Sequence, residues 1–139
     1  MIYLANDHGG VRLKNKIKKF LTKKRVEFVD LGTNTTQSVN YVDYAKKLCK
    51  KVLENDQNKG ILICKSGLGM SIVANRFVGI RAGLCYTKKA SKLARMHNDC
   101  NVLVLKGKTC FYKQIVSNFL TTQFEGGRHL ARVKSIDEL

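Results

Sequence analysis

One stretch of the sequence, residues 60–71, carries the side chains best suited to chemistry. A short apolar run ends in Cys64, and a serine and two glycines follow before an apolar-periodic segment begins. This order predicts a buried strand, a tight turn and a helix N-terminus, whose backbone N–H groups and dipole favour an anion. A thiolate is stabilised in such a place, so Cys64 could act as a base or nucleophile. The alternative is that Cys64 is one more small core residue, since cysteine is often buried.

Two pairs of residues elsewhere could also act on a ligand, and each pair has an ordinary structural explanation. Asp7 could hold sugar hydroxyls and His8 could bind phosphate or move protons. Alternatively, Asp7 caps the following helix and His8 faces solvent. His97 and Asn98 close a predicted helix, where histidine suits the negative helix end and asparagine is a common terminator.

Arginines and glycines supply two further candidates. Arg128 and Arg132 are four residues apart, so on a helix they share a face and could clamp a phosphate; they could equally be solvated. The Gly67-x-Gly69 pair could form an anion hole or an ordinary turn. It is too short for a dinucleotide fingerprint, and no G-x-G-x-x-G follows the first strand, which argues against a nicotinamide cofactor.

Strand-like and helix-like segments alternate along the whole chain, and they must position these residues. We expect strands at 2–5, 26–31, 60–64, 80–85 and 101–105, helices at 11–24, 44–53, 69–77, 88–96, 109–121 and 127–134, and a polar loop at 33–40. The alternation predicts an α/β fold: a doubly wound (Rossmann-like) five-stranded parallel sheet with helices on both faces, in one domain spanning 1–139.

In such a sheet, ligands bind at the carboxyl ends of the strands. Asp7 and His8 follow the first predicted strand, and the Cys64 turn follows the third, so both belong to that edge. His97 and Asn98 precede the fifth strand, and the fold alone does not place them there.

Composition narrows the class of protein. No apolar stretch approaches a membrane span, and the N-terminus lacks the pattern of a signal peptide. The five cysteines are odd in number and show no C-x-x-C spacing, which favours a reduced, cytoplasmic protein over a disulfide framework or a zinc site. We therefore expect no bound metal and no membrane contact.

The formal net charge of +16 raises the question of nucleic-acid binding. The basic residues are spread, however, and most are expected on the solvated faces of helices, without interleaved aromatic residues for base stacking. They include Lys14, Lys16, Lys18, Lys19, Lys23, Lys24, Lys46, Lys47, Lys50, Lys51, Lys88, Lys89 and Lys92. We expect no nucleic-acid partner, and the positive field would speed the capture of a phosphorylated small molecule.

Seven motifs in matching order give the chain a family resemblance. It resembles the sugar-phosphate isomerase family that holds the type B ribose-5-phosphate isomerases and the galactose-6-phosphate isomerase subunits. The resemblance covers nearly the whole chain, and its most specific part is the central motif. The motifs are residues 6–10 (NDHGG), 30–32 (DLG), 40–45 (NYVDYA), 64–75 (CKSGLGMSIVAN), 79–82 (GIRA) with 97–98 (HN), and 124–129 (FEGGRH).

The resemblance implies a reaction: interconversion of ribose 5-phosphate and ribulose 5-phosphate through a cis-enediolate, without a cofactor. Some members use a cysteine at the position of Cys64 as the base, and others use a glutamate where this chain has Asn75. This chain therefore looks like the cysteine-base type. The physics agrees, because the reaction needs one base that takes and returns a proton and donors where the oxyanion develops.

The resemblance also implies roles for other residues and a homodimer or dimer of dimers with shared active sites. Ser66 and His97 would assist ring opening, with His97 coming from the subunit that does not supply the base. The remaining residues would bind substrate: the enediolate contacts Gly67, Gly69, Met70 and Ser71, the phosphate contacts His8, Arg128 and Arg132, the sugar oxygens contact Asp7 and Asn98, and Tyr41 lines the pocket. Lys108 stands where some members carry an arginine that contacts phosphate.

Two departures from the family pattern stand out. Lys65 occupies a position next to the base where the family usually has glycine, and its charge could act on Cys64 or point away from it. Val42 replaces a common proline, which could loosen the segment that carries Tyr41.

Two alternative functions stay open at this point. One is an isomerase of a six-carbon sugar phosphate, such as galactose 6-phosphate or allose 6-phosphate, with pocket depth set near Tyr41 and loop 33–40. The other is a basic nucleic-acid-binding or regulatory protein on the same fold.

Overall fold

Five parallel strands form one sheet in the computed structural model, which describes residues 1–139. The strands run in the order β2-β1-β3-β5-β4. They are β1 (Ile2–Asn6), β2 (Phe28–Asp30), β3 (Lys59–Cys64), β4 (Ala82–Leu84) and β5 (Val102–Lys106). The three inner strands are almost entirely buried, which explains why their sequences are continuous apolar runs.

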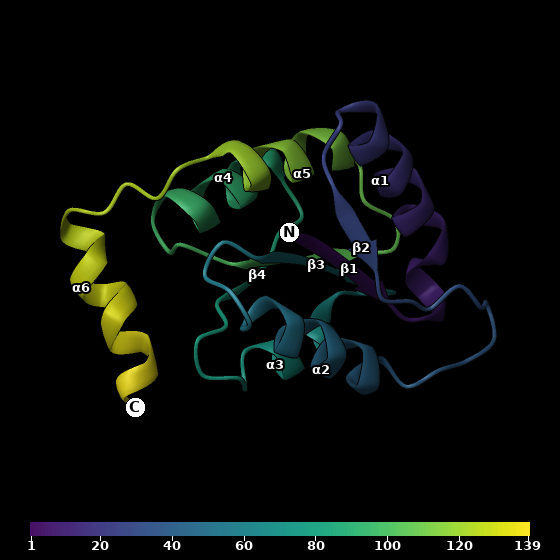
Figure 1. The fold of residues 1–139 in the computed structure, drawn as a ribbon, viewed down its shortest axis with the longest axis horizontal. Coiled ribbons are helices and arrows are strands. Elements are labelled where there is room, and N and C mark those ends of the chain that lie inside the picture. Colours follow the sequence, from purple (N-terminus) through teal and green to yellow (C-terminus); the bar gives the residue numbers. More distant parts are fainter.

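Helices cover both faces of the sheet, so the predicted α/β fold with a doubly covered parallel sheet is confirmed (Figure 1). Helices α1 (Val11–Lys23), α4 (Lys88–Met96) and α5 (Tyr112–Thr121) lie on one face, and α2 (Tyr41–Val52) and α3 (Leu68–Ala74) lie on the other. Two short 3-10 helices, η1 (His8–Gly10) and η2 (Ile136–Glu138), follow β1 and α6 (Arg128–Ser135). Helix α6 stands away from the body at the end of an extended segment (Figure 1).

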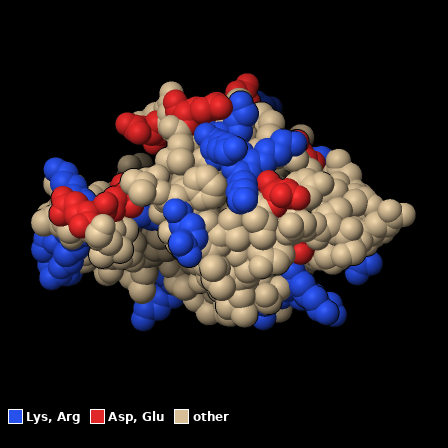
Figure 2. All heavy atoms as spheres, turned by 90° about the horizontal axis from the view of Figure 1, so that it is seen from below, with Lys and Arg blue, Asp and Glu red and all other residues tan.

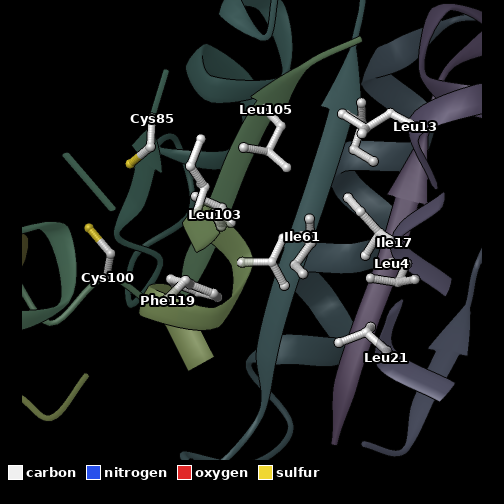
Figure 3. Packing of buried hydrophobic residues seen from close by; sticks show 13 residues of the cluster. Leu4, Leu13, Ile17, Leu21, Ile61, Cys85, Cys100, Leu103, Leu105 and Phe119 are labelled. Carbon is white, nitrogen blue, oxygen red and sulfur yellow. The ribbon is translucent and has the colours of Figure 1, made fainter. Parts of the chain in front are cut away.

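Two hydrophobic cores, one on each face, fix how the strands present their side chains. Ile61 belongs to the core beneath α1 and α5, where it packs in a layer with Leu4, Leu103 and Phe119 (Figure 3). Because successive strand residues point to opposite faces, Leu62 and Cys64 belong to the other core, beneath α2 and α3. The register of β3 therefore directs Cys64 toward the helix that follows it.

The edge strands β2 and β4 are shorter than the predicted runs at 26–31 and 80–85. Each pairs with one neighbour only. Beside β4, Asn75 ends α3 earlier than predicted, because its side-chain amide donates to Ala82 O at 2.9 Å and its Oδ1 accepts from Ala82 N at 2.8 Å.

The start of α2 also differs from the prediction. Asn40 is the N-cap, and its Oδ1 accepts a hydrogen bond from Val42 N at 3.0 Å. The helix therefore begins at Tyr41 rather than at Tyr44. Tyr41, which was expected to precede the helix, is held by its first turn.

Lys14 was expected on a solvated helix face, and this expectation was wrong. Its side chain is fully buried, and its Nζ lies 2.9 Å from Asp30 Oδ1, 2.6 Å from Thr33 O and 2.9 Å from Asn34 Oδ1. Burial lowers the pKa of Lys14, although Asp30 opposes that shift. The buried ammonium ties α1 to β2 and to the first residues of loop 33–40.

On the face that carries α2 and α3, the Lys and Arg side chains form separate groups, with acidic and uncharged residues between them (Figure 2). All five cysteines are free thiols, and only Cys110 is exposed. No helix has both the length and the apolar character needed to cross a membrane.

Candidate active site

Cys64 lies where β3 ends, and its thiol is almost covered, with 5% of the residue exposed. The chain then turns back on itself, so that Gly67 N–H donates a hydrogen bond to Cys64 Sγ at 3.1 Å. Gly67 has φ +80°, and a Cβ there would lie 2.5 Å from Leu84 Cδ1. Only glycine fits this position, because both the backbone conformation and the available space exclude a side chain.

The turn and the first residues of α3 present several backbone N–H groups beside the sulfur. Leu68 N–H donates to Ser66 Oγ at 3.2 Å. The N–H groups of Gly69 and Met70 make no hydrogen bond within the chain, as is normal for the first turn of a helix. These donors are therefore free for an anionic group bound next to Cys64.

The segment after β1 lies directly against this turn. A Cβ on Gly9 would come within 3.1 Å of Lys65 N. Asp7 is buried, and its Oδ1 accepts from Gly9 N at 2.9 Å, so it caps the short helix η1. The longer helix α1, which the structural alternative expected Asp7 to cap, has Gly10 as its N-cap. His8 is partly exposed, and its Nδ1 accepts from Val39 N at 3.2 Å, which holds loop 33–40 next to it and leaves Nε2 available.

Tyr41 and Lys108 complete the same edge of the sheet. The Tyr41 ring lies on the first turn of α3, since a Cβ on Gly69 would be 2.7 Å from ring atoms. Gly107 packs against the carbonyl of Gly9, and Lys108 follows it after the end of β5. The structure thus brings together one group of predicted site residues at the carboxyl ends of β1, β3 and β5: Asp7, His8, Tyr41, Cys64, Ser66, Gly67, Gly69, Met70, Ser71 and Lys108.

Two residues at this edge were not predicted from the sequence. Tyr86 donates its hydroxyl to Ser66 O at 3.0 Å. Lys106 pairs with Cys64 in the β3–β5 register, and its Nζ lies 4.9 Å from the centre of the Tyr86 ring. No motif marks either residue; the strand order places Lys106 beside Cys64, and that order cannot be read from the sequence.

A second cluster forms where α6 meets the end of α4. The His97 and His129 rings stack with centroids 4.3 Å apart, and His97 Nε2 lies 3.6 Å from Glu125 Oε2. Arg128 Nη1 lies 3.7 Å from Glu125 Oε1. Burial and the charge of Arg128 lower the pKa of His129, which favours its neutral form. Arg132 follows on α6, one helical turn after Arg128, as its spacing predicted.

These two clusters do not meet within one chain. Helix α4 begins beyond the carboxyl end of β4 and runs back toward the start of β5, so His97 and Asn98 lie at the opposite edge of the sheet from Cys64. Helix α6 carries Arg128 away from the body (Figure 1).

A cavity of about 700 Å³ lies away from the Cys64 turn. It lies beside β4, between α4 and the C-terminal residues Ile136 and Asp137. Among the predicted site residues only Asn98 lines it. The groups best suited to chemistry therefore line two open surfaces, at the Cys64 turn and at the start of α6, rather than this hollow.

The second cluster contains the one arrangement of metal-ligand types in the structure. His97, Glu125 and His129 each offer a ligand atom, and these atoms lie within 4.8 Å of one another. The sequence did not predict this cluster, because its members come from two segments far apart in the chain. The surroundings do not favour a cation: Arg128 already engages Glu125, and two arginines add positive charge.

Comparison with known proteins places the chain in a family. The model of the Ribose/Galactose Isomerase family matches residues 2–136. The chain is 41% identical over 133 residues to ribose-5-phosphate isomerase B of Escherichia coli, covering 94% of this chain and 89% of that protein.

Solved structures agree with this match. A ribose 5-phosphate isomerase of Thermotoga maritima superimposes with a TM-score of 0.96 at 48% identity, over 99% of this chain and 97% of that one. Ribose-5-phosphate isomerase B of Mycoplasma genitalium, solved with bound ribulose-5-phosphate, gives a TM-score of 0.93 at 38% identity, over 99% and 93% of the two chains. This chain belongs to the ribose/galactose isomerase family.

Proposed function

We propose that this protein is an aldose–ketose isomerase that interconverts ribose 5-phosphate and ribulose 5-phosphate, with Cys64 as the base. The observation that carries the proposal is the hydrogen bond from Gly67 N–H to Cys64 Sγ at 3.1 Å, at the end of β3. A backbone donor aimed at sulfur favours the thiolate, and the thiolate is the form that accepts a proton. Family membership supplies the class of reaction.

The reaction moves one proton between two neighbouring carbons. The Cys64 thiolate takes the proton from C2 of the open-chain aldose, which leaves a cis-enediolate. The hydroxyl proton passes from O2 to O1 within the cis-enediolate, and the Cys64 thiol then returns its proton to C1, which gives the ketose with its carbonyl at C2. The free N–H groups of Gly69 and Met70 support this step, because they are donors available to the developing oxyanion. These backbone groups belong to a fixed turn, so they need not reorganise as charge develops.

Ring opening and phosphate binding fall to the other cluster, together with His8 and Ser66. We propose that His97, assisted by Ser66 of the facing subunit, opens the sugar ring, and that Arg128 and Arg132 bind the phosphate with His8 and Lys108. Asp7 and Asn98 hold sugar oxygens. An arginine pair suits this task because each guanidinium can make two charge-assisted hydrogen bonds to a phosphate.

The distribution of these residues supports a homodimer with shared active sites. Within one chain, His97 lies at the opposite edge of the sheet from Cys64, and α6 extends away from the body (Figure 1). One substrate can contact both clusters if α6 and the end of α4 of one subunit reach the Cys64 turn of its partner. A closed two-fold dimer then holds two such composite sites.

The test is to incubate the purified protein with ribose 5-phosphate, galactose 6-phosphate and allose 6-phosphate. Turnover is measured as the rate of ketose formation. We expect ribose 5-phosphate to give the highest kcat/KM. Turnover confined to the hexose phosphates would replace the pentose assignment with the six-carbon alternative. No turnover on any sugar, together with DNA binding that falls steeply with salt, would favour the nucleic-acid alternative.

A further inference from the structure

The peptide unit between Ser66 and Gly67 is held at both ends. Its N–H, from Gly67, donates to Cys64 Sγ at 3.1 Å. Its carbonyl, from Ser66, accepts the Tyr86 hydroxyl at 3.0 Å. A trans peptide points its N–H and C=O in opposite directions, so the hydrogen bond at the carbonyl fixes the direction of the N–H. By holding the Ser66 carbonyl, Tyr86 thus fixes the orientation of the peptide plane whose N–H donates to the Cys64 sulfur.

We propose that Tyr86 is a positioning residue for Cys64, which it controls through the Ser66–Gly67 peptide without touching the sulfur. The inference rests on the proposed function only for its effect on turnover; its effect on the thiol is independent of any substrate. Tyr86 comes from the end of β4, two strands away from β3 in the sheet.

Hydrogen bonds in a chain strengthen one another. A donor at the carbonyl polarises the peptide and makes its N–H a better donor to the charged sulfur. The bond to a thiolate gains more from this than the bond to a neutral thiol, because a charged acceptor makes the stronger hydrogen bond. The Tyr86 hydroxyl therefore favours the thiolate form of Cys64.

Lys106 holds Tyr86 in place. Its ammonium lies 4.9 Å from the centre of the Tyr86 ring, within the range of a cation–π contact. Lys106 is fixed in turn by its position in β5, directly opposite Cys64. Tyr86 as a whole residue is 46% exposed, and this contact and the hydroxyl bond to Ser66 both act to orient its ring.

The experiment measures the alkylation of Cys64 by iodoacetamide as a function of pH in the wild-type protein and in Tyr86→Phe. Mass spectrometry of peptides separates Cys64 from Cys110, the one exposed cysteine, which serves as an internal reference in every sample. Tyr112→Phe is the matched control, since the Tyr112 hydroxyl makes no hydrogen bond in the chain. Phenylalanine keeps the ring and its contact with Lys106.

We expect Tyr86→Phe to slow alkylation of Cys64 about two- to fivefold at neutral pH and to displace its pH profile upward, with the same plateau at high pH. The Cys110 profile and the Tyr112→Phe protein should match the wild type. kcat at neutral pH should fall by a similar factor and recover at higher pH.

Two outcomes would overturn the inference. One is a Cys64 profile that does not move in Tyr86→Phe. The other is a plateau that drops while the midpoint stays fixed, because that result means that access to the thiol changed and not its ionisation. Both outcomes can be read from the alkylation data alone, so they leave the isomerase assignment to be judged by turnover.

Discussion

Lys14 shows how one buried side chain supports the site at a distance. Its ammonium is fully buried and bonds to Asp30, to Thr33 O and to Asn34 Oδ1. Thr33 and Asn34 open the loop that later places Val39 against His8 Nδ1. A charge in this position is costly unless it is fully bonded, and here it meets three oxygens.

Lys14→Met should therefore destabilise the protein by about 3 kcal/mol, because it removes the ammonium from Asp30 Oδ1 and leaves the oxygens of Thr33 and Asn34 without their donor. Lys18→Met is the matched control: Lys18 pairs with the other oxygen of Asp30 at 2.9 Å, but its side chain is 34% exposed. That change should cost under about 1 kcal/mol. Urea unfolding measures both, and equal losses would show that burial does not distinguish the two pairs.

Asp30 gives the stability a dependence on acid pH. Burial alone would raise its pKa, but hydrogen bonds from Lys18 and Lys14 prevail and hold the pKa of folded Asp30 below its usual 3.8. The unfolded chain thus binds the proton more readily than the folded protein. The stability that Asp30 contributes is complete above about pH 4 and is lost as pH falls through the lowered folded value.

Unfolding free energies measured from pH 7 to pH 3 should fall more steeply for the wild type than for Asp30→Asn. The variant should already be less stable at neutral pH, since it lacks the charge that faces two lysines. Asp56→Asn, at an exposed position, should keep the wild-type slope. An unchanged slope in Asp30→Asn would contradict the assigned shift.

At the scale of elements, α6 is the helix to which the proposed function assigns phosphate binding. Its sequence places Arg128 and Arg132 on one face, and the glycines before it, Gly126 and Gly127, both adopt positive φ angles that turn the chain. The helix stands away from the sheet (Figure 1), and its buried His129 stacks on His97 of the body. An element with this charge and this exposure is suited to bind a phosphate held by another subunit.

Replacing Arg128 and Arg132 with alanine should raise KM for ribose 5-phosphate by about two to four powers of ten, since each contact contributes roughly 1.5–3 kcal/mol. The effect should be much smaller for ribose without its phosphate. Lys134→Ala, on the same helix, serves as the control. Steady-state kinetics on both sugars provide the measurement, and an equal loss on both would indicate a folding role for the two arginines.

Much of the element structure could be predicted from periodicity, and the misses have physical causes. The inner strands and α4 were placed within a residue or two, because full burial or a clear amphipathic face gives a strong pattern. The edge strands were drawn too long, since partial burial leaves their ends without a distinct signal. The early start of α2 depends on the Asn40 cap, and the burial of Lys14 depends on its partner Asp30. Hydrophobic periodicity reveals neither of these side-chain contacts.

The site could be predicted only in two halves. The strand-end rule places Asp7 and the Cys64 turn together, and the structure agrees. Tyr86 and Lys106 reach this turn through the strand order, which sequence spacing does not specify. His97 and Cys64 lie far apart within a single chain. Whether they meet depends on how two chains associate, and sequence spacing contains no information about that.

At the scale of the whole molecule, the proposed sharing of sites can be tested by mixing inactive variants. Cys64→Ala and His97→Ala are refolded together, and mass spectrometry establishes that chains have exchanged. If the two residues act in trans, each mixed dimer has one doubly damaged site and one intact site. About half the dimers are mixed under random exchange, so activity should return to roughly a quarter of wild type.

If the two residues act within one chain, every site in the mixture carries a lesion and no activity returns. A confirmed heterodimer without recovered activity would thus contradict the shared site. It would leave the family and the fold of the chain unaffected.

The central claim is that Cys64 is the base of an isomerase, and the most direct measurement is kcat for conversion of ribose 5-phosphate by wild type and Cys64→Ala. Calorimetry of substrate binding accompanies it, and Cys110→Ala is the control for loss of a cysteine elsewhere. We predict that Cys64→Ala loses nearly all turnover but still binds substrate. Cys110→Ala should not show this loss of turnover. A Cys64→Ala protein that keeps about a third of the wild-type kcat would contradict the assignment of the base.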